Sequence, residues 1–193
     1  MEERRRAFLK YLDLPTNTTA AWEFGNLVVE KAEESGVSRV LVFFKGSTLT
    51  HTPERQKQCD ASWIPRELPT GRAKHWPSVA LEAGYSESQA KLRRDMEFWL
   101  NRSCNEVQMG ITVDIKRPSG KIFFTTWRRG TPVPPRTAAR GKNGEQETIS
   151  GDENITVPFS AIMLRDRAEG ETDFILTREE LLEVAEKVWF AMD

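Results

Sequence analysis

The stretch SVALEAGYSESQAKLRRDMEFWLNRS, residues 78–103, decides the fold of this chain. Its first seven residues are almost all apolar, which predicts a strand buried on both faces over 78–84. After serines that can cap a helix, apolar residues recur every three or four positions and predict a helix over 86–103. A buried strand followed by an amphipathic helix is typical of an α/β protein. Glu82 is the acidic residue inside this strand, and a buried charge is costly unless it is paired, hydrogen-bonded or bound to a metal.

The rest of the chain extends this alternation of strands and helices. Helical periodicity and β-branched runs predict further elements, namely helices over 16–36 and 177–192, strands over 38–44, 59–65 and 155–166, and a hairpin over 106–130. Residues 130–155 contain few apolar side chains, so we expect an exposed, flexible loop there. The sequence therefore predicts one domain over 1–193, with an α/β fold in which a mixed central sheet is flanked by helices and extended by a C-terminal strand and helix.

Composition limits the classes of function. The formal net charge is −1, which argues against a strong non-specific nucleic-acid binder, although the basic segment 127–142 leaves a nucleic-acid partner open. Two cysteines are too few for a disulfide framework, and the first residues contain no apolar segment of signal-peptide length. No apolar run is long enough to span a membrane. We therefore expect an intracellular protein of the cytoplasm or nucleus.

Two carboxylates form the candidate site. Asp60 begins one predicted strand and Glu82 lies in the middle of the next. Acids on neighbouring strands can converge on Mg²⁺ or Mn²⁺, which take oxygen ligands and can activate water against a phosphodiester. An acid on the first helix, Glu23 or Glu30, would complete such a metal site.

QCDASWIP followed by WPSVALEAGYSESQAKLRRDMEFWL resembles short fungal proteins of the restriction-endonuclease-like, PD-(D/E)XK superfamily. The resemblance covers about residues 16–127 and is strongest over 58–100. It implies a nuclease-like core in the order helix, strand, strand, strand, helix, strand. By position, it implies that Asp60 and Glu82 are catalytic, metal-binding acids, with Glu23 as the acid of the first helix.

The sequence departs from the superfamily pattern at two positions. Cys59 stands where proline is usual, and Gly84 stands where the motif lysine is expected. Because some members carry that lysine on the following helix, the resemblance offers Lys91 as a catalytic substitute. An ordinary ion pair between Lys91 and Asp95, four residues apart on the helix, is the simpler role for both.

Three functions remain open from the sequence. The first is a metal-dependent nuclease. The second is a nuclease fold without nuclease chemistry, which binds a partner or a small apolar organic molecule in the former cleft, with Trp63 and Trp76 as candidate ligand-stacking residues. In such an apolar pocket Glu82 would have a raised pKa. The third is an interaction module that uses helix 177–192.

Overall fold

A computed structural model describes residues 15–45, 49–51, 56–85, 89–129, 131–132, 135–141, 146–151 and 154–193. Its centre is one mixed sheet with the strand order β1-β4-β5-β6-β7-β9-β10, and β8 pairs beside β7. Among the described strands of this sheet, only β5 and β6 pair in parallel, and helix α3 connects them, while the other neighbours are antiparallel. The predicted α/β fold with a mixed central sheet flanked by helices is confirmed.

The chain forms twelve strands and four helices within the described ranges. The strands are β1 (Leu41–Lys45), β2 (Leu49–His51), β3 (Gln56–Gln58), β4 (Ala61–Pro65), β5 (Val79–Tyr85), β6 (Met109–Lys116), β7 (Lys121–Arg128), β8 (Thr131–Pro132), β9 (Arg136–Ala139), β10 (Thr148–Ser150), β11 (Ile155–Val157) and β12 (Phe174–Leu176). The helices are α2 (Thr16–Glu34), α3 (Gln89–Arg102), α4 (Phe159–Met163) and α5 (Arg178–Phe190).

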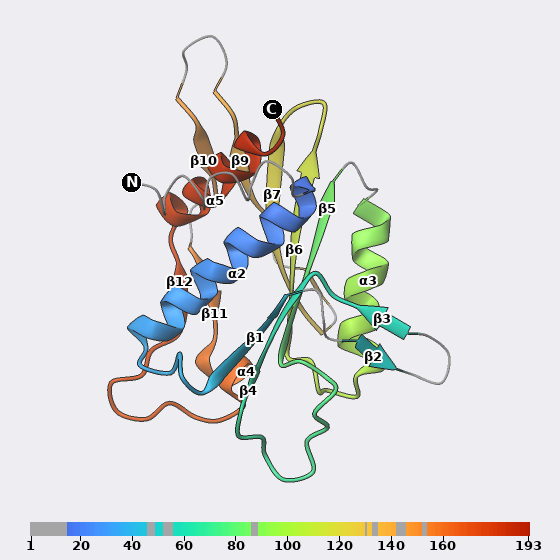
Figure 1. Cartoon of the computed structure of the whole chain (residues 1–193), viewed down its shortest axis with the longest axis vertical. Helices are drawn as coiled ribbons and strands as arrows, with labels where there is room; N and C mark the ends of the chain where they lie inside the picture. Colours follow the sequence, from blue (N-terminus) through green and yellow to red (C-terminus); the bar gives the residue numbers. More distant parts are fainter. Residues whose placement is uncertain are drawn as a thin grey trace, which may run out of the picture.

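The two faces of the sheet carry different helices, because successive side chains of a strand point to opposite faces. Leu81 and Ala83 of β5 pack in the main core with residues of α2 and α5. Ala80 packs in a second cluster with residues of α3, such as Met96 and Trp99. Figure 1 shows α2 crossing in front of the strands and α3 beside β5 and β6 at the right of the view. Glu82 has the parity of Ala80 and therefore belongs to the α3 face.

Local sequence explains the helices that were predicted correctly. In α3, Leu92, Met96 and Trp99 are buried at positions four and three residues apart, which gives the helix one apolar stripe. In α5, the Thr177 side chain accepts from the Glu180 backbone N–H and the Glu180 carboxylate accepts from the Thr177 N–H. This capping box ties down the start of the helix.

Two expectations about the C-terminal half need correction. Described parts of 130–155 form β8, β9, β10 and the first residue of β11 rather than a loop throughout. One buried apolar side chain on each of β9 and β10, Ala138 and Ile149, is enough to pack these two strands against the core. Residues 155–166 are not one strand, because β11 ends at Val157 and Pro158, which lacks an N–H, precedes α4.

A third difference lies between β1 and β4. The sequence indicates only a polar connection there, and the structure places the β2–β3 hairpin in it. Among the described residues, no helix is long and apolar enough to cross a membrane.

Candidate functional site

Asp60 directly precedes β4, and Glu82 lies in the neighbouring strand β5. Ala61 is paired with Leu81 in antiparallel register, so Asp60, one residue earlier, lies across from Glu82. The Asp60 backbone N–H donates to the Leu81 carbonyl at 3.1 Å, and the Asp60 carboxylate accepts from the Ala83 N–H at 2.7 Å. The Asp60 side chain therefore fixes the backbone of β5 beside Glu82.

Lys57 of β3 is the cation of this site. Its ammonium lies 2.8 Å from Glu82 Oε1 and 3.0 Å from Asp95 Oδ1 of α3. All three side chains are less than a tenth exposed. This acid–lysine–acid cluster therefore joins β3, β5 and α3 at one point. Because the ion pairs are buried, salt and water screen them little.

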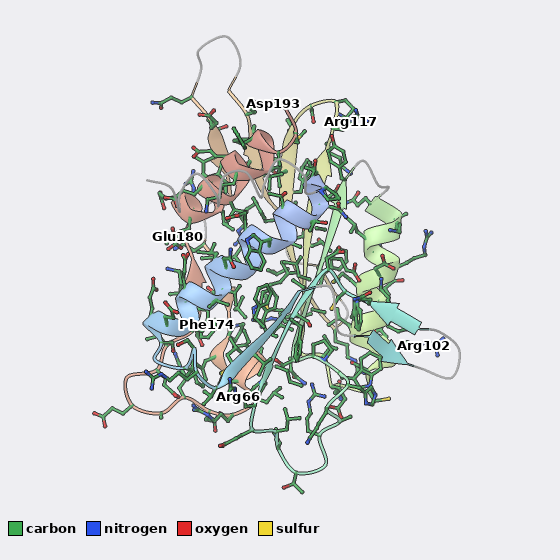
Figure 2. All side chains as sticks on the ribbon, in the orientation of Figure 1. Arg66, Arg102, Arg117, Phe174, Glu180 and Asp193 are labelled. Atoms are coloured by element: carbon green, nitrogen blue, oxygen red, sulfur yellow. The ribbon has the colours of Figure 1, made fainter. Side chains whose placement is uncertain are left out.

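Helix α3 also contacts Glu82 directly. The indole N–H of Trp99 donates to Glu82 Oε1 at 2.6 Å. Trp99 packs edge-on against Trp76 and Phe98, with ring centroids 6.1 and 5.2 Å away. The same carboxylate oxygen thus accepts from both Lys57 and Trp99, and aromatic rings exclude water around it. Figure 2 shows side chains filling the space between α3 and the sheet, with Arg102, the last residue of α3, labelled.

Burial governs the acid–base properties of the cluster. Desolvation raises the pKa of Glu82 to about 7; the nearby Lys57 and Trp99 lower it in part, and the charge of Asp60 raises it. Burial also raises the pKa of the Cys59 thiol to about 12, so this cysteine is a neutral side chain of the cluster under α3. Glu82 is therefore poised between its charged and neutral forms near neutral pH.

The structure gives Glu82 a different lysine from the one that the motif offers. Lys91 is an exposed residue of α3, whereas Glu82 receives its ion pair from Lys57. At Gly84, a Cβ would lie 3.0 Å from Leu92 Cδ1, so a side chain at the motif position would meet α3. Leu92 thus occupies the space that a lysine at position 84 would need, and the positive charge comes from another strand.

The third predicted acid lies elsewhere. Glu23 is buried on α2, on the face of the sheet opposite to α3, and its Oε2 lies 2.8 Å from the ammonium of Lys187 on α5. Glu30 is an exposed residue of the same helix. The structure brings Asp60 and Glu82 together but does not bring Glu23 to them.

The two predicted stacking residues lie in the interior. Trp63 is fully buried in the α2-side core, where it stacks on Phe43 with centroids 5.6 Å apart. Trp76 is buried on the α3 side and contacts Trp99. Trp76 therefore shields the acid cluster.

Protein groups already engage part of the donor set that the two acids would offer a metal. Glu82 Oε1 already accepts two hydrogen bonds from Lys57 and Trp99, and Asp60 Oδ2 accepts one from Ala83. Within the described ranges, no group of three or more His, Cys, Asp or Glu side chains is placed to hold a metal ion. A metal bound through Glu82 Oε1 would compete with Lys57 and Trp99 for that oxygen.

A groove adjoins the cluster on the same face of the sheet. Its volume is about 590 Å³, and it lies between the start of α3 and strands β6 and β7. Thr112 of β6, the register partner of Glu82, lines it, as does Asp114, the register partner of Gly84. The groove thus begins one strand away from Glu82.

Local sequence patterns do not reveal Lys57, Trp99 or the role of Asp95. Lys57 lies three residues before Asp60 in a segment that the sequence indicates as a connection, and nothing in its spacing marks it as a partner of Glu82. The apolar stripe of the helix correctly predicts a buried Trp99 but not its hydrogen bond. For Asp95 the spacing predicts a pair with Lys91 along the helix, and the ion pair that Asp95 makes with Lys57 has no local signal.

We expect Asp60→Ala to lower the free energy of unfolding by about 1–3 kcal/mol, because the Ala83 N–H would lose its acceptor. Asp60→Asn keeps an acceptor oxygen and should cost clearly less. Urea unfolding of the two variants measures the difference. Equal losses would show that the Asp60 charge, and not this hydrogen bond, stabilises β5.

The order of elements from α2 to β6, apart from the added β2–β3 hairpin, is the order that the resemblance in the sequence implies. No family model and no curated protein matches the chain. Among solved structures, the chain is similar to one from Anabaena variabilis ATCC 29413 described as "a putative nuclease belonging to DUF820". The two share 12% sequence identity with a TM-score of 0.48, over 89% of this chain and 83% of that one. A likeness at this level carries no argument about function, which has to come from the residues of this chain.

Proposed function

We propose that this protein has a nuclease-like fold that does not cleave phosphodiesters, and that it binds a small organic molecule on the α3 face. The observation that carries the proposal is the contact of 2.8 Å between the Lys57 ammonium and Glu82 Oε1. The lysine supplies, from within the chain, the positive charge that a metal supplies in a metal-dependent nuclease.

The energetics of burial support this role for Lys57. Removing one partner from a buried ion pair typically costs about 3–5 kcal/mol, because the other charge is left without compensation. Lys57 pairs with both Glu82 and Asp95, so a divalent ion bound to Glu82 would meet the charge of this ammonium. The resident ammonium therefore competes with a metal ion for Glu82.

The adjoining groove supports the ligand-binding part of the proposal. Its volume of about 590 Å³ falls within the range of about 300–1,000 Å³ that is usual for small-molecule sites. Apolar and aromatic side chains line it together with a similar number of polar and charged ones, so it offers both an apolar surface and groups that can orient a ligand. The groove and the closed acid cluster lie side by side.

A second candidate function rests on a different aspect of Lys57. Lys57 lies beside Glu82, and Glu82 lies across from Asp60. The three residue types of the nuclease motif are therefore present, with the lysine coming from β3. A metal-dependent nuclease with a relocated lysine would use this set. The two candidates differ in whether Lys57 excludes the metal or acts with it.

Cleavage and metal-binding assays separate the two candidates. We expect the wild-type protein, incubated with Mg²⁺ or Mn²⁺ and with single-stranded DNA, duplex DNA and RNA, to give no hydrolysis above that of an Asp60→Asn, Glu82→Gln double variant. Calorimetry should show no more Mn²⁺ binding by the wild-type protein than by the double variant. Metal-dependent cleavage that the double variant loses would favour the relocated-lysine nuclease and overturn the first proposal.

A further inference from the structure

One buried carboxylate in the groove lacks a complete set of partners. Asp114 is 6% exposed, and its Oδ2 lies 2.7 Å from the Lys116 ammonium. Its Oδ1 is buried and has no hydrogen-bond partner among the residues that the structure describes. Buried polar atoms are nearly always hydrogen-bonded, so an unpaired acceptor on a residue that lines the groove indicates a position where a ligand donor belongs.

The other walls define the body of that ligand. Phe123 lies across from Asp114 in the β6–β7 register, and Thr125 lies across from Thr112. Trp127, two residues on, donates its indole N–H to Thr112 Oγ1 at 2.9 Å, which fixes the ring at the edge of the groove. Leu92 of α3 closes the groove from the helix side. Two aromatic rings and a leucine favour an aromatic or otherwise apolar body.

The charges in the groove define the polar group of the ligand. Because Lys116 already pairs with Asp114, the remaining oxygen needs a hydrogen-bond donor but not a second cation. The two cations that line the groove among the described residues, Arg93 and Lys116, already pair with Glu97 and Asp114, and the Asp114 carboxylate would repel a phosphate beside it, so a nucleotide is a poor occupant. The groove reaches the end of β6 at Lys116, the residue before Arg117, which is labelled in Figure 2.

We propose that this groove is the binding site for a small, uncharged aromatic molecule whose hydroxyl or N–H group donates to Asp114 Oδ1. This inference rests on the proposed function, since it names the site and the ligand class that the proposed function leaves undefined. Asp114 sets the specificity for a donor group, and Phe123 and Trp127 hold the ring.

Two matched probes test the donor requirement on the full-length protein. The first is 2-naphthol, which has an O–H donor, and the second is 2-methoxynaphthalene, which has the same rings without the donor. We expect the wild-type protein to bind 2-naphthol about tenfold or more tightly than 2-methoxynaphthalene by equilibrium dialysis, as a hydrogen bond to a charged group implies. In Asp114→Leu this ratio should fall to about one.

Two further variants control the experiment. Ala90→Trp places a large ring at an exposed position of α3 that lines the groove, and both probes should lose binding. Glu179→Leu removes an exposed carboxylate on α5, away from the groove, and should behave as wild type. Ala90→Trp keeps the groove assignment testable even where Asp114→Leu fails to fold.

Several results would overturn the inference. These are equal binding of the two probes to wild type, a preference for 2-naphthol that survives in Asp114→Leu, unchanged binding in Ala90→Trp, or no binding of either probe. Binding that both groove variants leave unchanged would keep a ligand-binding function but remove it from this groove. A wild-type protein that binds neither probe and cleaves nucleic acid with a metal ion would overturn the proposed function as well.

Discussion

Replacement of Lys57 by methionine is expected to lower the free energy of unfolding by about 3–5 kcal/mol at pH 8. Methionine keeps the apolar stem but removes the ammonium that lies within 3.0 Å of both Glu82 and Asp95. Two buried carboxylates would then face each other across the site with no cation between them. Urea unfolding followed by circular dichroism measures the loss.

Lys91→Met is the matched control for this prediction. Lys91 is the lysine that the sequence motif offers, but it is exposed on α3, so its replacement should change stability by less than about 1 kcal/mol. Similar small effects for both variants would contradict the role of Lys57 as the resident cation of the cluster. A large effect for Lys91→Met alone would favour the helix lysine as the partner of the acids.

The second large effect concerns the pH dependence of stability. The pKa of Glu82 is raised from an ordinary value of 4.5 to about 7, mainly by burial. Between these values the folded protein holds a proton that the unfolded chain releases, so stability falls as the pH rises through this window. The stabilisation is complete below about pH 4.5 and is lost above about pH 7; the difference corresponds to about 3 kcal/mol.

Glu82→Gln isolates this contribution. Glutamine keeps a carbonyl oxygen that accepts from Trp99 and Lys57 but does not titrate. We expect the wild type to lose about 3 kcal/mol more than the variant between about pH 5 and pH 8. Glu97→Gln, at an exposed position of α3, should keep the wild-type pH dependence.

Chemical denaturation at several pH values tests this prediction. Parallel curves for the wild type and Glu82→Gln would show that Glu82 titrates as an ordinary carboxylate. A wild type that gains stability relative to the variant as the pH rises would show that the ion pair with Lys57 outweighs burial. Either result would rule out a closed, half-protonated cluster near neutral pH.

Local sequence signals were sufficient for the elements whose tertiary setting agrees with them. The apolar run of β5, the stripe of α3 and the hairpin of β6 and β7 were each predicted, and so was the position of Asp60 beside Glu82 on neighbouring strands. Periodicity is strong in these segments because each one faces a core. Such signals act over a few residues and do not depend on distant parts of the chain.

The partners of Glu82 could not be predicted for the same reason. Lys57 reaches Glu82 from a hairpin 25 residues earlier, as the difference between the two residue numbers shows, and only the folded sheet brings them together. The orientation of α3 decides that Trp99 contacts the carboxylate and that Lys91 is exposed. Helix rotation of this kind is set by packing, because the periodic pattern fixes the buried face but not each contact within it.

The groove illustrates a different limit. Thr112, Asp114 and Phe123 alternate along two strands and have the pattern of the polar and mixed face of a hairpin. Asp114 is buried, and it lines a groove that side chains of α3, β6 and β7 form together. The orphan acceptor is therefore a property of the packed layers rather than of the strand sequence.

The most direct test of the central claim is a crystal of the wild-type protein soaked in Mn²⁺, with anomalous diffraction data collected near the manganese edge. We predict no anomalous peak between Asp60 and Glu82, and density for the Lys57 ammonium within hydrogen-bonding distance of Glu82. An anomalous peak bonded to both carboxylates, with Lys57 displaced from Glu82, would contradict the claim that the lysine takes the place of the metal.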